Sequence, residues 1–229
     1  FVGHDANRAG AQLVLLHWLK ERKAQGYTNY LLLVDGGSLL EEYKKVAKVW
    51  VWKTDRPLWF KIKQRLPGLR QAEEWDKTPS QRKMSQILSS LGEEAFECII
   101  GNTVSSLSLL RELVSLHVPF EVYVHELSYS ISNFTSEEDR KFMANQVSRV
   151  YAVSALVKTV LENEVGVRAE NIDLLPPIIE LPEATKNTND PVRAALGIPA
   201  NSPIVFSCGL VEWRKGPDVF LEVARKLID

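Results

Sequence analysis

Short apolar runs alternate with longer amphipathic segments along most of this chain. Because these runs are continuous in apolar character, they are typical of strands buried on both faces, as in a parallel sheet. Strands alternating with helices form βαβ units, so the pattern predicts an α/β fold. The predicted strands are Tyr30–Val34, Val46–Trp52, Cys98–Ile100, Val118–Val124, Val150–Val153, Ile172–Leu175 and Ile204–Cys208. The predicted helices are Ala11–Gln25, Gln81–Leu91, Ser105–Leu116, Ser136–Gln146, Ser154–Glu164 and Pro217–Leu227.

Charge and cysteine content narrow the class of protein. The net charge of -1 gives no global field that would attract nucleic acid, so no nucleic-acid partner is expected. Both cysteines, Cys98 and Cys208, lie in apolar runs and are predicted to be buried free thiols, which fits a reducing compartment. With no apolar run of membrane-spanning length, the sequence predicts a cytoplasmic protein and leaves a peripheral membrane contact open.

Composition shifts divide the chain into two predicted domains. Residues 1–178 carry most of the α/β pattern, and 179–190 read as a linker because proline and polar residues dominate there. Residues 191–229 offer one strand and one helix, which cannot close a domain. We therefore expect a truncated second domain, and an incomplete, inactive fragment.

The charged segment 54–79 is predicted to be an insertion or variable loop region. Its aromatic residues either pack on the sheet or line an acceptor pocket.

The first candidate site is the loop GHDANRAG and the helix that follows it. Glycines before a helix N-terminus make a geometry in which backbone N–H groups favour an anionic or hydroxyl-rich ligand. The dinucleotide fingerprint G-x-G-x-x-G is absent. The alternative is that these glycines only allow tight turns and bind no ligand.

The second candidate is His125, which with Glu126 directly follows a predicted strand in VYVHELSYSI. The carboxyl ends of parallel strands point into the binding crevice. A histidine there can hydrogen-bond a ligand or exchange a proton near neutral pH. The alternative is a structural loop histidine, as we expect for His17 and His117.

The third candidate is the pair Arg214-Lys215 in GLVEWRKGPDVF. Two cations before a helix N-terminus favour a phosphate group, whereas an exposed, solvated basic pair is the alternative.

The histidines and cysteines show no ligand-type spacing, so no zinc site is predicted. No G-x-S-x-G is present for a serine hydrolase.

Four stretches together resemble family 4 glycosyltransferases, the retaining GT-B family that uses nucleotide-sugar donors. They are GHDANRAGAQLVLLHWLK, VYVHELSYSI, VYAVSALVKTVLENEVGV and FSCGLVEWRKGPDVFLEVARKL, and they span nearly the whole chain. The resemblance implies a Rossmann-like, acceptor-side domain with a parallel sheet, followed by the start of a Rossmann-like donor domain. The enzyme that the resemblance implies is of bacterial type.

The resemblance also implies roles for individual residues. His125 matches the family's active-site histidine, and Gly10 matches the glycine loop that faces donor phosphate and acceptor. Asn7, Arg8 and Glu126 are assigned to this acceptor and phosphate loop. Arg214 and Lys215 fall in the segment that contacts the donor diphosphate. Leu210 departs from the family, since many members have arginine there.

The implied reaction moves a sugar from a nucleotide diphosphate to a hydroxyl, with retention of configuration. It implies no cofactor and no metal, because basic residues stabilise the leaving diphosphate. The implied partners are a nucleotide sugar and a glycan, lipid or other hydroxyl acceptor. The alternatives are a nucleotide-sugar epimerase of the same fold and a non-catalytic sugar-binding module. A dinucleotide oxidoreductase is disfavoured by the missing fingerprint.

Overall fold

The computed structural model describes residues 1–52, 86–92, 94–177, 191–209, 211 and 213–228. The chain divides into two compact units, Phe1–Glu180 and Leu181–Asp229, and each is described by itself. Three predictions fall outside the described residues: the linker over 179–190, the insertion over 54–79, and the departure at Leu210.

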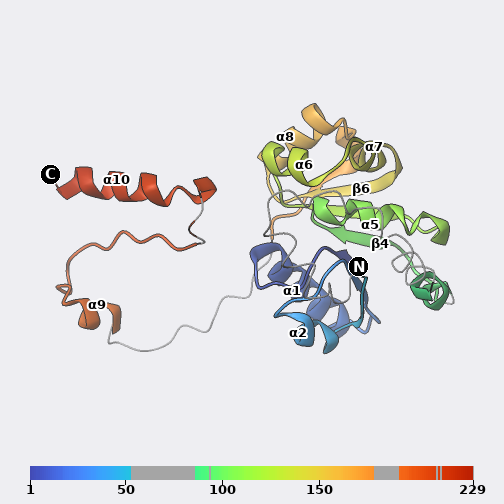
Figure 1. The fold of residues 1–229 in the computed structure, drawn as a ribbon, viewed down its shortest axis with the longest axis horizontal. Helices are drawn as coiled ribbons and strands as arrows, with labels where there is room; N and C mark the ends of the chain where they lie inside the picture. The colour runs from blue at the N-terminus through green and yellow to red at the C-terminus, as the bar shows by residue number, and fades with distance from the viewer. Residues whose placement is uncertain (53–85, 93, 178–190, 210, 212, 229) are drawn as a thin grey trace, which may run out of the picture. The chain divides into compact units, whose positions relative to one another are not determined.

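Within the described residues, seven strands form one parallel sheet in the first unit (Figure 1). They are β1 (Val2–Gly3), β2 (Tyr30–Leu33), β3 (Lys48–Val51), β4 (Ile99–Asn102), β5 (Phe120–Val124), β6 (Val147–Ala152) and β7 (Ile172–Leu174). Their spatial order is β3-β2-β1-β4-β5-β6-β7, and every pair of neighbours is parallel. The order reverses between β1 and β4, which is the point where open α/β sheets bind ligands.

Helices cover both faces of the sheet. Figure 1 shows α1 (Gly10–Ala24) and α2 (Leu40–Lys44) on one side, and α5 (Leu107–Arg111), α7 (Glu137–Gln146) and α8 (Ala155–Val160) on the other. This division follows from right-handed crossovers that run outward from β1 in two directions. The shorter elements are α6 (Ser128–Phe134), the 3-10 segments η1 (Val104–Ser106), η2 (Val114–Leu116) and η4 (Ala169–Asn171), and the π-helical segment η3 (Leu161–Val165). Residues 86–91 are also helical.

Local sequence signals account for several helix ends. Ser136 and Asp139 form a capping box at the start of α7, each side chain accepting a hydrogen bond from the other's backbone N–H. Ser154 caps α8, as its position predicts, and Gly166 ends η3 in the left-handed conformation with φ of 81°. The single helix predicted over Ser105–Leu116 is instead broken into η1, α5 and η2.

The core lies in two apolar clusters, one on each face. The first contains Leu15, Leu16, Leu19, Leu31, Leu33, Leu39 and Tyr43, which join α1 and α2 to β2. The second joins β1 and β4–β7 to the helices of the opposite face, and it includes Leu107, Leu109, Leu110, Val122, Val124, Phe142, Met143 and Val150. The strand residues of both clusters come from the continuous apolar runs of the sequence, so the prediction of strands buried on both faces is confirmed for β2, β4 and β5.

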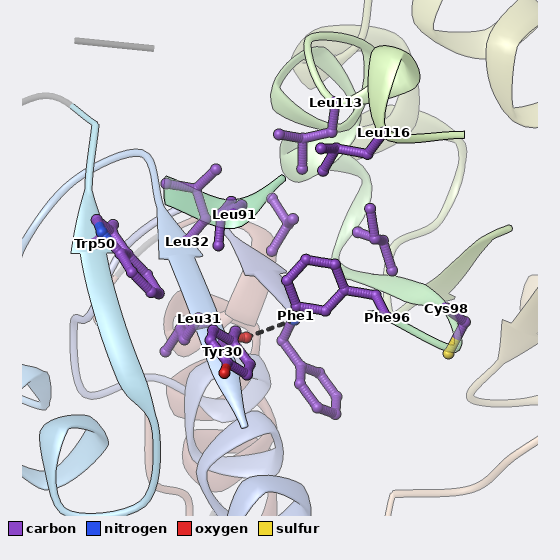
Figure 2. A pocket seen from close by; sticks show the side chains of 12 residues that line it. Phe1, Tyr30, Leu31, Leu32, Trp50, Leu91, Phe96, Cys98, Leu113 and Leu116 are labelled. Carbon is purple, nitrogen blue, oxygen red and sulfur yellow. Dashed lines mark hydrogen bonds between the residues drawn. The ribbon is translucent and has the colours of Figure 1, made fainter. Parts of the chain in front are cut away.

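A small cavity of about 30 Å³ lies near the amino ends of β1, β2 and β4 (Figure 2). Its walls are mainly apolar, and Tyr30 stacks on Trp50 with ring centroids 6.0 Å apart. Phe96 meets the edge of the same tyrosine ring at 5.2 Å. A space of this size is that of about one water molecule. We interpret it as a packing void, at the opposite edge of the sheet from the candidate site.

The second unit contains α9 (Pro191–Leu196), the 3-10 turn η5 (Trp213–Lys215) and α10 (Pro217–Ile228). The strand predicted over Ile204–Cys208 is wrong, because the structure assigns no strand there. A strand is defined by hydrogen bonds to a neighbour, and this described segment pairs with none. Its residues are exposed, among them Phe206 at 78%. The prediction that Cys208 is buried is therefore also wrong, whereas Cys98 is half-buried.

Candidate active site

Polar side chains follow β1, β4 and β5 at the carboxyl edge of the sheet, beside the switch point. His4 comes directly after β1, Thr103 after β4 and His125 after β5. His4 Nδ1 lies 3.1 Å from Thr103 Oγ1, although these residues are 99 positions apart in the chain. The parallel register therefore gathers residues from three strands at one edge, and this is where we place the candidate site.

His125 is held by groups on several sides. Its Nε2 lies 3.1 Å from Oδ1 of Asn102, the last residue of β4. Its ring lies against Tyr123, with centroids 4.3 Å apart. Burial, and to a smaller extent the neighbouring His4, lowers the pKa of His125 to about 4. The imidazole is therefore neutral at pH 7.

His4 belongs to a second hydrogen-bonded group at the start of α1. Gln12 Nε2 donates to Asp5 Oδ1 at 2.6 Å and lies 3.0 Å from His4 Nε2. Burial alone would raise the pKa of Asp5, but hydrogen bonds from the Asn7 backbone and from Gln12, together with His4, lower it overall. Asp5 is thus a carboxylate that orders the loop between β1 and α1.

The N-terminus of α1 is open. Gly10 is its first residue, no side chain caps it, and its first turn carries no acidic residue. A Cβ built at Gly10 meets nothing within 4 Å, so space lies beside this helix end. Backbone N–H groups and the helix dipole there favour a negatively charged group. This geometry fits the phosphate loop predicted from the sequence.

Two other predicted loop residues have partners within the protein. Asn7 donates to Asp5 through its backbone N–H and its side-chain amide, both at 2.9 Å. Arg8 is exposed and forms an ion pair with Glu42 of α2. Asn7 therefore shapes the loop, and the Arg8 guanidinium lies with α2 in this structure.

Glu126 holds the backbone of the site. Its Oε2 accepts hydrogen bonds from the backbone N–H of His125 at 2.9 Å and of Val104 at 3.4 Å. Burial raises the pKa of the Glu126 carboxyl, although these backbone donors act in the opposite direction. The side chain thereby links the loop after β4 to the loop after β5.

The residues predicted to contact the donor diphosphate belong to the second unit. Arg214 and Lys215 lie in η5, followed by Gly216 at φ of 61° and then by α10. The Lys215 side chain is exposed. A positive φ favours glycine, so Gly216 allows the chain to turn between η5 and α10.

The sequence analysis missed five residues of the site. They are His4, Asp5, Gln12, Asn102 and Thr103. A signal was present, since His4-Asp5 follows β1 in the same way as His125-Glu126 follows β5. Asn102 and Thr103 give no such signal, because their place in the site depends on β4 lying between β1 and β5 in the sheet.

A larger hollow of about 400 Å³ lies beside α1, with Trp18 and Tyr123 among its lining residues. Tyr123 also contacts His125 through its ring. The hydrogen-bonded residues around His4, Asn102 and His125 are not among the described lining residues of this hollow. We therefore treat it as separate from the candidate site.

Thr103 has a strained backbone, with φ of 75° and ψ of 156°. Only glycine adopts this region without cost, and other residues there cost about 1–3 kcal/mol. Ordinarily alanine is about 0.5–1 kcal/mol more stable than glycine in regular structure. At this position we expect the reverse, with Thr103→Gly more stable than Thr103→Ala by about 1–2 kcal/mol, since both lose the hydroxyl and only glycine relieves the strain.

Urea unfolding of the two Thr103 variants, compared at the same pH, measures this difference. Because both variants lose the contact to His4, their comparison isolates the backbone. If the alanine variant were equally stable or more stable, the strain would be absent in solution.

Two kinds of feature are absent from the described residues. No group of three or more histidine, cysteine, aspartate or glutamate residues there is arranged to hold a metal ion. Likewise, none of the helices in the described part of the chain has both the length and the apolar character needed to cross a membrane.

Comparison with known proteins gives similarity in structure but not in sequence. No protein-family model matches the chain, and no curated protein matches it significantly. Among solved structures, a glycosyltransferase from Rickettsia africae is similar with a TM-score of 0.58, 15% identity, and coverage of 88% of this chain and 50% of that one. HepE from Anabaena, solved with UDP, has a TM-score of 0.57 at 17% identity, with coverage of 86% and 49%.

The lipopolysaccharide outer core galactosyltransferase WaaB is also similar, with a TM-score of 0.53, 11% identity, and coverage of 82% of this chain and 49% of that one. The chain spans about half the length of these structures. At such identities the likeness shows the fold. The α/β class and the Rossmann-like, GT-B type of parallel sheet domain predicted from the sequence are confirmed.

Proposed function

We propose that this chain is part of a retaining GT-B glycosyltransferase of family 4, which transfers a sugar from a nucleotide diphosphate to an acceptor hydroxyl. The observation that carries the proposal is the position of His125, which Asn102 links to the first turn of α1, beside the switch point of the sheet. Further support comes from HepE, which is similar in fold and has been solved with UDP and with UDP-glucose.

In this proposal, the N-terminus of α1 faces the sugar and its diphosphate. Departure of the diphosphate develops negative charge, which oriented backbone N–H groups stabilise without moving. Arg214 and Lys215 supply positive charge from the donor domain. We expect the reaction to need no cofactor and no metal.

His125 then serves as a binding group. With a pKa of about 4, its ring is neutral at pH 7 and accepts a hydrogen bond more readily than it supplies a proton. A sugar hydroxyl is a suitable donor for such a nitrogen. Of the two roles that a histidine at this place can take, holding the transferred sugar is the one that we propose.

The acceptor is a glycan, a lipid or another molecule with a free hydroxyl, and we propose that it binds on the side of the loop between β1 and α1. We place the enzyme in the cytoplasm, with nucleotide sugars as its donor substrates. A lipid acceptor would bring the protein to the membrane surface.

The donor class is tested with the full-length protein and a panel of radiolabelled nucleotide sugars. Transfer of label to an acceptor, or release of free nucleotide diphosphate, is the expected result. We expect Lys215→Ala to raise the donor KM about tenfold, since a charge-assisted hydrogen bond contributes roughly 1–3 kcal/mol. The control Lys226→Ala removes an exposed lysine at the opposite end of α10 and should leave KM unchanged.

Other results would overturn the proposal. Label recovered only in an epimerised nucleotide sugar would identify an epimerase of the same fold. Binding of a nucleotide sugar with no turnover of any kind would identify a non-catalytic module.

A further inference from the structure

Asn102 lies between α1 and β5, and only 1% of it is exposed. Its Nδ2 donates to the backbone carbonyl of Ala11 at 3.1 Å. Its Oδ1 lies 3.1 Å from Nε2 of His125. Both ends of one buried amide are therefore used, one by the first turn of α1 and one by the histidine.

The Ala11 contact fixes which way this amide faces. If the amide were turned over, Oδ1 would face the carbonyl oxygen of Ala11, and two acceptors would meet in a buried place. Oδ1 therefore faces the His125 ring. Because Oδ1 only accepts, the proton of the neutral ring must lie on Nε2, which leaves Nδ1 as an acceptor.

Nδ1 of His125 is open to a ligand. No described group forms a hydrogen bond with it. In the described part of the chain, every fully buried side-chain nitrogen or oxygen has a partner, so Nδ1 is not a fully buried atom. The backbone of His125 is held by Glu126 and its ring by Tyr123, so the direction of this atom is set as well.

His4 provides an internal contrast. The side-chain amide of Gln12 donates to Asp5 and lies 3.0 Å from His4 Nε2, which is also 3.5 Å from Asp5 Oδ2. The closer contact is to the Gln12 N–H, so we infer that Nε2 accepts in the neutral ring. The proton of His4 is left on Nδ1, facing Thr103 Oγ1. Both ring nitrogens of His4 are occupied, so of these two histidines only His125 has a nitrogen available to a ligand.

We infer that Asn102 is a positioning residue, which fixes His125 in the Nε2–H tautomer and so offers Nδ1 to a hydroxyl of the ligand. Identification of that hydroxyl with one on the transferred sugar rests on the proposed function. The tautomer itself depends only on the contacts of Asn102 and stands without it.

The test is nitrogen NMR on protein with ¹⁵N-labelled histidine, because ring nitrogens with and without a proton differ widely in chemical shift. The chain has four histidines, and His125→Gln identifies the signals of His125. We expect Nε2–H for His125 and Nδ1–H for His4, with His125 remaining neutral as the pH is lowered towards 4. An Nδ1–H ring at His125 in the unaltered protein would overturn the inference.

The role of Asn102 is tested by Asn102→Leu, which has a similar branched shape and no acceptor. We expect the Nδ1–H form of His125 to rise at least severalfold. The matched control is Asn29→Leu, which removes another buried amide that donates to the carbonyls of Leu19 and Val46. The control should leave the His125 tautomer unchanged.

An unchanged tautomer in Asn102→Leu would show that Asn102 does not set it. If that variant does not fold, Asn102→Ala removes the same acceptor with a smaller side chain, and the same outcomes apply. Sugar transfer is measured separately. An Nε2–H ring in a protein that transfers no sugar would reject the proposed function and leave the tautomer assignment intact.

Discussion

Replacing His125 by alanine in the full-length protein is expected to lower turnover by at least about a hundredfold, because the group that holds the transferred sugar is lost and a misplacement of the reacting atoms by about 1 Å costs about that much. The ring is the one that Asn102 and Tyr123 hold at the carboxyl edge of the sheet. Stability should change little, by about 1–2 kcal/mol at most, because water can reach the half-buried position and replace the lost hydrogen bond. Steady-state kinetics and urea unfolding of the same preparation measure the two effects.

The control for this experiment is His117→Asn. His117 is exposed, lies outside the site and has a left-handed backbone with φ of 53°, which asparagine tolerates well. Its turnover should equal that of the unaltered protein. Near-normal turnover of His125→Ala would remove His125 from the active site, and a comparable loss in His117→Asn would show that the assay reports something other than the site.

Gly37→Ala is expected to destabilise the protein by about 2–4 kcal/mol, since the added Cβ has no room and must displace backbone. A Cβ at this position would lie 2.3 Å from the carbonyl carbon of Ala6 and 2.5 Å from the backbone nitrogen of Asn7. No rotamer can relieve a contact with backbone, so the loop between β1 and α1 must move. This loop carries Asp5 and follows His4, and we therefore expect a lower kcat/KM as well.

The neighbouring glycine gives a matched control. A Cβ at Gly36 meets nothing within 4 Å, so Gly36→Ala should alter stability by no more than about 0.5–1 kcal/mol. Urea unfolding of both variants measures the difference. Equal stability of the two would mean that the close approach of Gly37 to Ala6 is absent in solution.

Much of the fold could be predicted because its signals are local. Continuous apolar runs predicted six of the seven observed strands within a few residues, and the helical segment predicted over Ser154–Glu164 is found between its capping serine and Gly166. His125 was found for the same reason, since it directly follows an apolar run. The strand predicted over Ile204–Cys208 was wrong because a strand also requires a neighbour, which no local signal supplies.

The polar residues of the site could not be predicted in the same way. Asn102 and Thr103 end an ordinary apolar run, and their importance comes from β4 lying between β1 and β5. Arg8 was assigned to a phosphate loop, and its pairing with Glu42 depends on how α2 packs. The close approach at Gly37 is likewise a tertiary contact, and nothing in the adjacent pair of glycines distinguishes it from Gly36.

The strand order has a consequence for how the molecule folds. β4 to β7 pair with their nearest neighbours in sequence, so each pairing closes a short loop. β1 instead pairs with β4, joining Val2 to Gly101 across a long stretch of chain. Closing that loop costs more entropy and is expected to come late in folding. His4 and Thr103 contact each other across this pairing of β1 with β4. The candidate site can therefore assemble only when the two halves of the sheet have joined. Ligand binding would then report that folding is complete.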